Sequence, residues 1–272
     1  DYTTLKSAFD AINAGTITGS ITLKIISSTT ETISAVLNAS GSGSANFSSV
    51  LIYPLSSGLS ISNSGNVESL IYFNGADNVT IDGRVNQSGS ADLIITNSYA
   101  SGNSRTIAFL NDACSNTIKY CTVKGSTTAT GRGIIHFSTS SLTGNDNNII
   151  DVCNITNSGS RPLQAIYSSG SMGKDNSGNI ISNNHIYDIL SASFSSSYGI
   201  SIAGASTDFI ISGNSFYETA VFTPVSGNNY NAIRVLSNTN HTIRNNYIGG
   251  TAPNCGGSAM TMRMRLMDDP DG

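Results

Sequence analysis

The chain has 272 residues, of which 38% are hydrophobic and only 11% are charged, and its formal net charge is −4. The small charged share excludes a helical bundle with long Lys/Glu faces, and the recurring Ile, Val and Leu residues exclude a disordered polyampholyte. The negative charge argues against a nucleic-acid partner, which requires a basic face. No apolar run approaches the ~18 residues of a transmembrane helix, so we expect no membrane insertion.

The first predicted element is a helix over residues 3–14, where apolar residues recur at helical spacing, at Leu5, Ala8, Phe9 and Ile12. Thr3 or Thr4 can cap its start, and Gly15 can end it. We interpret residues 1–15 as a short amphipathic helix that caps the fold that follows. The alternative is a linker helix from a preceding domain.

Four short β-prone runs follow, separated by turns rich in Ser and Gly, at residues 21–26, 33–37, 50–53 and 59–62. The sequence does not give their register against the later repeats. From residue 70 onward, two series of strands become regular. One centres on Ile71, Ile107, Ile134, Ile166, Ile200 and Ile233, and the other on Ile81, Ile118, Ile150, Ile181, Ile211 and Ile243.

Both series have the same period. Ile71 and Ile233 are five repeats apart, as are Ile81 and Ile243, which gives a mean period of about 32 residues. Such a period indicates a solenoid, a propeller or an array, but propeller blades need about 40 residues or more and antiparallel hairpins. We therefore predict an all-β fold, a right-handed parallel β-helix with three parallel sheets and regular coils over residues 70–250.

A third apolar series lies five residues after the second, at Val123, Ile155, Ile186, Phe216 and Ile248. In a solenoid, residues at equivalent positions of successive coils stack into columns, so these three series are expected to form the core. We predict a single domain over residues 1–258. Residues 259–272 break the pattern and are interpreted as an irregular tail at a truncation or boundary.

The I-x-x-N-x-I repeats resemble those of the parallel β-helix, or pectin-lyase-like, superfamily. LKSAFDAINAGTITG, NGADNVTIDGRVN and KYCTVKGS are similar to stretches of large secreted bacterial surface proteins that carry this domain. The resemblance covers roughly residues 2–257. It implies the β-helix fold and a secreted or cell-surface location, and the superfamily includes lyases, hydrolases, esterases and non-catalytic adhesins.

One column follows the second series by three residues and consists of Cys121, Cys153, Asn184, Asn214 and Asn246. In this family such a column occupies the turn between strands, where Asn side chains bond to the backbone, so we expect a structural ladder. Cys121 and Cys153 are then neighbours on adjacent coils. They are either stacked free thiols or a disulfide, because the coil spacing lies within the range that a disulfide spans.

His136 stands two residues after Ile134, where other coils place Phe73, Phe109, Ile202 and Val235. We therefore expect His136 in an inward column, as a core histidine rather than a catalytic base.

The candidate functional residues lie in outward columns. Tyr187-Asp188 and Tyr217-Glu218 occupy equivalent positions on adjacent coils. Aromatic faces can cover sugar rings and flanking carboxylates can bond hydroxyls, so the candidate ligand-binding residues are Tyr187, Tyr217, Tyr167 and Lys124. Two carboxylates on adjacent coils also suit a retaining glycosidase, for which Asp188, Glu218 and His185 are the candidate catalytic residues. The alternative without a functional role is a pair of solvated carboxylates at strand ends.

Three functions remain open. The first is a non-catalytic module for adhesion or for binding a polysaccharide or cell-surface glycan. The second is a polysaccharide lyase or glycoside hydrolase, and the third is a purely structural spacer in a longer adhesin. A uronate lyase needs clustered cations and a tuned base, yet the 13 Lys and Arg residues are dispersed. No cofactor or metal is predicted: Ca²⁺ would need several acidic oxygens, and no acidic cluster appears. We therefore favour the binding module.

Overall fold

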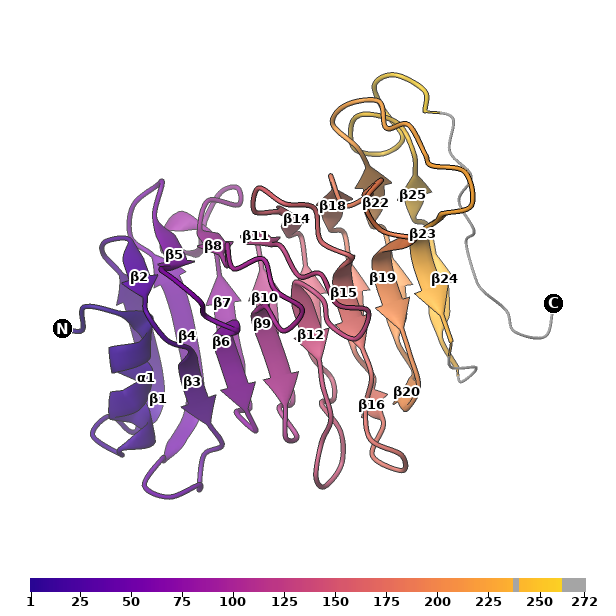
Figure 1. Ribbon diagram of the computed structural model, residues 1–272. Coiled ribbons are helices and arrows are strands. Elements are labelled where there is room, and N and C mark those ends of the chain that lie inside the picture. Colours follow the sequence, from indigo (N-terminus) through magenta and orange to yellow (C-terminus); the bar gives the residue numbers. More distant parts are fainter. Residues whose placement is uncertain (237–239, 261–272) are drawn as a thin grey trace.

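Three parallel sheets run along the molecule, and successive coils contribute one strand to each (Figure 1). The computed structural model describes residues 1–236 and 240–260. Within them the chain is an all-β parallel solenoid with coils of about 32 residues and one short N-terminal helix, as the sequence predicts. The part of the tail at residues 261–272 lies outside the described residues.

We name the sheets A, B and C in the order in which the chain enters them. Sheet A consists of β1 (Gly19–Ile25), β4 (Phe47–Pro54), β7 (Val79–Asp82), β10 (Thr117–Lys119), β13 (Ile149–Asp151), β17 (Ile180–Ser182), β21 (Ile210–Ser212) and β24 (Thr242–Arg244). Sheet B consists of β2 (Thr29–Glu31), β5 (Ser60–Asn63), β8 (Ile94–Thr96), β11 (Thr122–Gly125), β14 (Asn154–Asn157), β18 (His185–Tyr187), β22 (Ser215–Tyr217) and β25 (Tyr247–Ile248).

Sheet C consists of β3 (Ala35–Asn38), β6 (Ser69–Asn74), β9 (Arg105–Leu110), β12 (Ile135–Phe137), β15 (Gln164–Ser168), β19 (Ser196–Ile202) and β23 (Asn229–Val235). A small two-stranded sheet pairs β16 (Asn176–Ser177) with β20 (Ser206–Thr207), and a 3₁₀ turn, η1, spans Val85–Gln87. No helix among the described residues is long and apolar enough to span a membrane.

Helix α1 (Leu5–Asn13) covers the N-terminal end of the solenoid (Figure 1). The hydroxyl of Thr4 caps it by accepting a hydrogen bond from the backbone N–H of Ser7 at 3.0 Å. Phe9 and Ile12 are fully buried, which confirms the expected apolar stripe. The carboxylate of Glu31 in β2 accepts the backbone N–H groups of Leu5 and Lys6 at 2.9 and 3.1 Å, which fastens the helix to the first coil.

The early strands join the same register as the later ones. Leu23 pairs with Ile52, and Ile52 pairs with Ile81 of the regular series. The regular coils therefore begin at β1, well before residue 70.

The inward columns form the core. Ile118, Ile150, Ile181 and Ile211 are each 0% exposed. Burying one such side chain stabilises the fold by roughly 1.5–3 kcal/mol. The column ends at Ile243 in the last coil, which is 36% exposed.

Strand β12 differs from the expected register by one residue. Ile135, rather than Ile134, pairs with Ile107 of the previous coil. The cause is a local bulge, because the backbone N–H groups of Thr106 and Ile107 both donate to the carbonyl oxygen of Ile134, at 2.8 and 3.1 Å. The extra residue shifts every following side chain of the strand to the opposite face.

The inward position predicted for His136 is therefore wrong. Phe137 takes the inward position and stacks on Phe109 at 4.9 Å, whereas His136 lies beside Tyr167 on the outer face of sheet C. His136 is nevertheless only 2% exposed. Loops that connect sheet B to sheet C cross in front of this face (Figure 1) and cover it.

Asparagine side chains tie the turns of successive coils together. The amide of Asn184 donates to Oδ1 of Asn214 at 2.9 Å, and that of Asn214 donates to Asn246 at 3.0 Å, so the predicted ladder is present. One coil earlier in this column, the backbone N–H of Cys153 donates to Oδ1 of Asn184 at 2.9 Å. Cys153 and Cys121 are buried free thiols.

Candidate functional site

The rings of Tyr187 and Tyr217 lie on the outer face of sheet B, on neighbouring coils. β18 and β22 pair so that Tyr187 lies beside Tyr217 and Ile186 beside Phe216. Because Ile186 and Phe216 are buried in the core, the alternation of side chains directs both tyrosines outward. The two rings stack, with centroids 5.1 Å apart and an interplanar angle of 15°.

The following coil has a glycine at the position next to Tyr217. β25 pairs with β22 up to Ile248, so Gly249 comes next in the column of Tyr217. A Cβ atom built on Gly249 would meet nothing within 4 Å. At position 249 the next coil therefore adds no side chain to the tyrosine stack, and an apolar ligand surface can pack on the aromatic rings. Burial raises the pKa of Tyr217 to about 12, with Tyr187 and Asp188 adding to the shift, so its hydroxyl remains a neutral donor.

An open hollow of about 480 Å³ adjoins the tyrosine pair, over the turns that connect sheets A and B. It is lined by Asn183, His185, Ser212, Gly213, Arg244, Asn245, Tyr247 and Asn254. The ring of His185 meets that of Tyr217 edge to face, with centroids 6.2 Å apart and planes at 74°, and so links the hollow to the stack. Burial lowers the pKa of His185, so its imidazole is neutral at physiological pH.

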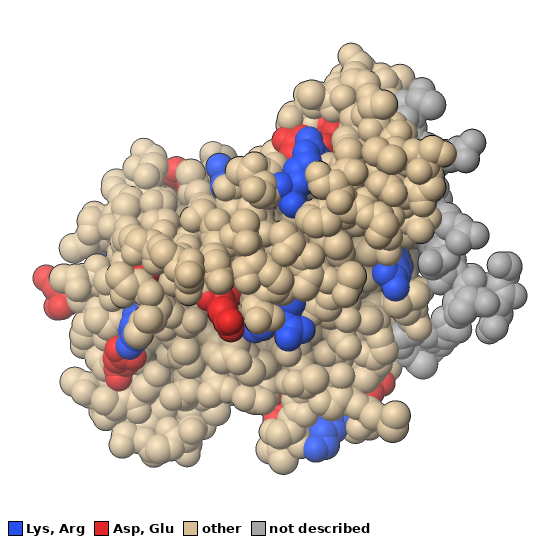
Figure 2. Space-filling model, in the orientation of Figure 1, with Lys and Arg blue, Asp and Glu red and all other residues tan. Residues whose placement is uncertain are grey.

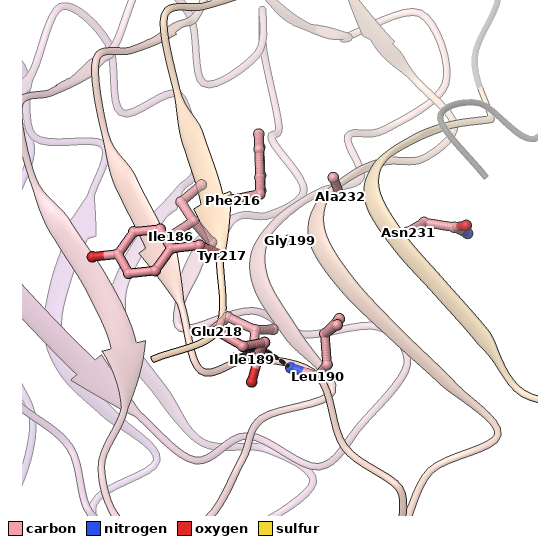
Figure 3. Close-up of a pocket in the computed structure, with 9 residues that line it drawn as sticks. All are labelled: Ile186, Ile189, Leu190, Gly199, Phe216, Tyr217, Glu218, Asn231 and Ala232. Carbon is pink, nitrogen blue, oxygen red and sulfur yellow. Dashed lines mark hydrogen bonds between the residues drawn. The ribbon is translucent and has the colours of Figure 1, made fainter. Parts of the chain in front are cut away.

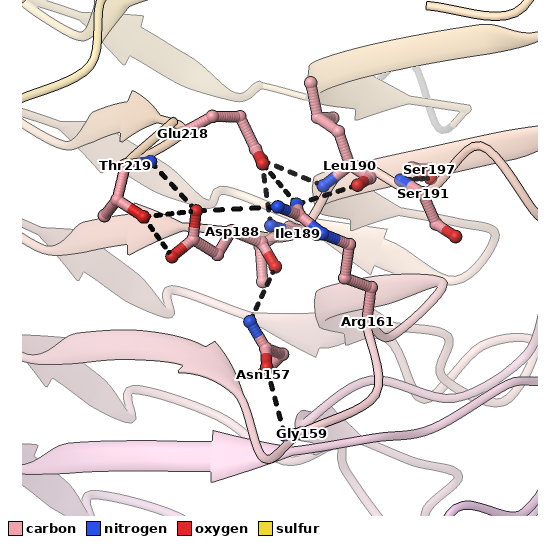
Figure 4. A network of polar contacts seen from close by, with 10 residues as sticks. All are labelled: Asn157, Gly159, Arg161, Asp188, Ile189, Leu190, Ser191, Ser197, Glu218 and Thr219. Atoms are coloured by element: carbon pink, nitrogen blue, oxygen red, sulfur yellow. Dashed lines mark hydrogen bonds and ion pairs between the residues drawn. The ribbon is translucent and has the colours of Figure 1, made fainter. Parts of the chain in front are cut away.

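Asp188 and Glu218 share one cation. Arg161, from the loop between β14 and β15, forms an ion pair with Oε2 of Glu218 through Nη1. Its Nη2 lies 3.7 Å from Oδ1 of Asp188. Figure 4 shows the guanidinium between the two carboxylates. The sequence predicted the two acids as neighbours but gave no reason to place Arg161 with them, because Arg161 lies in a loop outside the repeat.

Both carboxylates also accept hydrogen bonds from neighbouring residues. Oε1 of Glu218 accepts the backbone N–H groups of Ile189 and Leu190, both at 3.0 Å, and the residue is 1% exposed. Asp188 accepts the backbone N–H of Thr219 at 2.9 Å and its hydroxyl at 2.8 Å. Burial raises the pKa of Glu218, and the hydrogen bond from Leu190 and the charge of Arg161 oppose that rise. These contacts fasten the ends of two coils together, whereas a catalytic acid or nucleophile has to reach its substrate.

A small, partly open pocket adjoins this network at Glu218 (Figure 3), with a volume of about 20 Å³. Its lining includes Ile186, Phe216 and Glu218, and also Asn231, whose buried Oδ1 has no hydrogen-bond partner among the residues that the structure describes. Such a volume suits one water molecule. It is too small for a sugar ring, so a saccharide would have to bind on the outer surface.

The other two predicted ligand-binding residues lie apart from the tyrosine pair. Lys124 is in the same column, but Thr156 separates it from Tyr187. Tyr167 is on sheet C, where its ring stacks on His136 with centroids 5.4 Å apart. The structure therefore brings together Tyr187, Tyr217 and His185, but not Tyr167.

A second polar cluster on the outer face of sheet C was missed from the sequence. Burial and the charges of Arg105 and Arg132 hold the pKa of His136 well below its usual range. Nδ1 of His136 and Nε of both arginines are buried and have no hydrogen-bond partner within the described part of the chain. The arginines escaped the column analysis because they lie at or before strand starts, after loops of unequal length. Since His136 is only 2% exposed, this cluster offers less open surface than the face of sheet B.

Charged side chains are few and scattered on the face shown in Figure 2. Among residues 1–236 and 240–260, no three His, Cys, Asp or Glu side chains are grouped so that they could hold a metal ion. No family model, curated protein or solved structure matches the chain.

Proposed function

We propose that this chain is a non-catalytic carbohydrate-binding module of a secreted or cell-surface protein, and that it binds a polysaccharide on the outer face of sheet B. The observation that carries the proposal is the stack of Tyr187 on Tyr217, which ends at Gly249 beside an open polar hollow. The extracellular location rests on the resemblance of the repeats to those of bacterial surface proteins.

The chemistry of this face matches that of a sugar. A pyranose has an apolar face that packs on aromatic rings and a rim of hydroxyl groups that need hydrogen-bond partners. The tyrosine stack supplies the first. The exposed amides of Asn183, Asn245 and Asn254 in the hollow supply both donors and acceptors for the second.

The scaffold holds these groups in place before a ligand binds. Glu218 and Asp188 are fixed by Arg161 directly after the two tyrosines, and the ladder of Asn184, Asn214 and Asn246 fixes the turns below the hollow. Rigid binding groups lose little conformational entropy when they bind, which favours affinity. The engagement of both carboxylates in these contacts favours binding over glycoside hydrolysis.

Affinity electrophoresis through gels that contain a panel of polysaccharides tests the proposal. We expect at least one gel to retard the wild type, and the double variant Tyr187→Ala/Tyr217→Ala to lose that retardation. Tyr2→Ala is the matched control, because Tyr2 is an exposed tyrosine at the other end of the chain. Equal mobility of wild type and double variant in every gel would refute the proposed site. Release of reducing ends or of unsaturated uronate from any panel member would instead favour the enzyme alternative.

A further inference from the structure

The hollow beside the tyrosine stack is a groove one coil wide. Ser212 and Gly213 form its floor. The previous coil raises one wall with Asn183 and His185, and the following coil raises the other with residues that include Arg244 and Tyr247. Neighbouring strands are about 4.8 Å apart, so the two walls stand on strands roughly 10 Å apart, which suits a single extended saccharide chain.

The floor of the groove lies below its walls because the floor residues have no large side chains. Ser212 pairs with Arg244 across the two coils, so a small side chain faces a long one. Gly213 has φ of +68°, and a Cβ atom there would lie 2.5 Å from Oδ1 of Asn183. A side chain at position 213 would therefore both strain the backbone and fill the groove.

Of the residues in 1–236 and 240–260 that line the groove, Arg244 alone is charged. It is exposed, and its guanidinium forms no ion pair or hydrogen bond with any residue that the structure describes. The nearest acid in its own column of sheet A is Asp151, three coils away, with Ser182 and Ser212 between them. At about 4.8 Å per coil this exceeds the Debye length of about 8 Å at physiological ionic strength, so Asp151 does not neutralise Arg244.

We infer that Arg244 makes this groove selective for an anionic saccharide chain, one that carries sulfate or carboxylate groups. This inference rests on the proposed carbohydrate-binding function and adds the charge of the ligand to it. A guanidinium binds the oxygens of a sulfate or carboxylate through two parallel N–H donors, and the neutral imidazole of His185 and the three amides bond the uncharged part of the chain.

Two pairs of polymers that differ in charge test this selectivity: dextran with dextran sulfate, and hydroxyethyl cellulose with carboxymethyl cellulose. We expect the wild type to bind the anionic member of at least one pair more tightly than its neutral partner. Arg244→Gln should weaken that binding roughly tenfold or more, because it removes hydrogen bonds to a charged group, and should leave any binding of the neutral partner unchanged. Arg244→Lys should restore part of the affinity.

The charge-matched control is Lys24→Gln, which removes one positive charge from an exposed site in β1, at the other end of the solenoid. If Lys24→Gln weakens binding as much as Arg244→Gln, the effect is that of net charge and the inference fails. It also fails if the wild type binds neither anionic polymer, or binds both members of each pair equally. A protein that binds a neutral polysaccharide through Tyr187 and Tyr217, with no response to Arg244→Gln, would contradict this inference and leave the proposed function standing.

Discussion

Asn148 and Asn179, on neighbouring coils, are joined by two hydrogen bonds. The backbone N–H and the side-chain amide of Asn148 both donate to Oδ1 of Asn179, at 2.9 and 3.1 Å. The same arrangement repeats one coil earlier, where Asn116 donates twice to Oδ1 of Asn148. All three side chains are fully buried. This ladder satisfies backbone groups at the turns between sheets C and A that water cannot reach.

Asn148→Ala should destabilise the protein strongly. It removes the acceptor of two donors from Asn116 and leaves the carbonyl oxygen of Ala113 without the amide that binds it at 2.9 Å. Each buried polar group left unsatisfied costs roughly 1–3 kcal/mol, so we expect a loss of at least about 3 kcal/mol in the free energy of unfolding, measured by urea denaturation. The control Asn154→Ala, on the half-buried outer face of sheet B, should cost less than about 1 kcal/mol. Similar losses for both variants would contradict this account of the ladder.

Glu31→Gln should weaken the attachment of α1. The carboxylate of Glu31 accepts two N–H groups at the positive end of the helix, and the amide that replaces it retains only one acceptor oxygen. We expect a loss of about 1–3 kcal/mol in unfolding free energy. Asp10→Asn serves as the comparison, because Asp10 forms an exposed i,i+4 pair with Lys6 at 2.5 Å, and such pairs contribute only about 0.5 kcal/mol. If Glu31→Gln and Asp10→Asn lower the unfolding free energy by the same amount, Glu31 does not hold α1 in the way described.

Protonation of His136 should destabilise the protein as the pH falls. Burial and the charges of Arg105 and Arg132 lower its pKa in the folded state. The unfolded chain therefore binds a proton near pH 6.5 that the folded chain rejects, and stability is lost as the pH falls below that value. Between pH 7.5 and pH 5, this contribution can reach at most about 2 kcal/mol, the limit set by the unfolded pKa of about 6.5.

His136→Phe isolates this effect because it keeps a ring against Tyr167 but cannot take up a proton. The difference in unfolding free energy between wild type and variant should shift in favour of the variant from pH 7.5 to pH 5, by at most about 2 kcal/mol. A difference that stays constant over this range would show that His136 titrates normally in the folded protein.

The four cysteines should differ in their reaction with a thiol reagent at pH 8. Cys255 is exposed and should react first, whereas burial raises the pKa of the Cys114 thiol to about 11 and should slow it. Cys121 and Cys153 are buried, and the neighbouring Cys153 raises the pKa of Cys121. We expect the thiols of Cys121 and Cys153 to react with the reagent only after the chain is unfolded. No reductant should be needed for this reaction. Failure of both to react in the unfolded, unreduced chain would reveal a disulfide.

The period of the isoleucine series was enough to predict the fold, because burial imposes the same spacing on every coil. The column from Ile118 to Ile211 lies where the repeat places it. The repeat failed at His136, where one extra residue in the coil of Ile134 moves the following side chains to the other face. A bulge of this kind depends on backbone contacts with the previous coil, which a single sequence does not display.

The candidate site was predictable only where it follows the repeat. Tyr187 and Tyr217 occupy equivalent strand positions, so their stacking follows from the period. The position of Arg161 does not follow from the period, because this residue reaches Glu218 from a loop 57 residues earlier in the chain. Arg244 stands in an outward column, but its role depends on the small side chains of the coil before it, which only the folded groove makes apparent.

Hydroxyl-radical footprinting of the full chain, with and without the polysaccharide that retards it most in the affinity gels, tests the central claim most directly. Ligand binding should protect Tyr187, Tyr217 and Tyr247 from oxidation, because these rings line the proposed site on sheet B. The oxidation of Tyr72 and Tyr167 on sheet C should stay unchanged. Protection of the sheet C tyrosines without those of sheet B, or no protection at a saturating concentration of the ligand, would contradict the account.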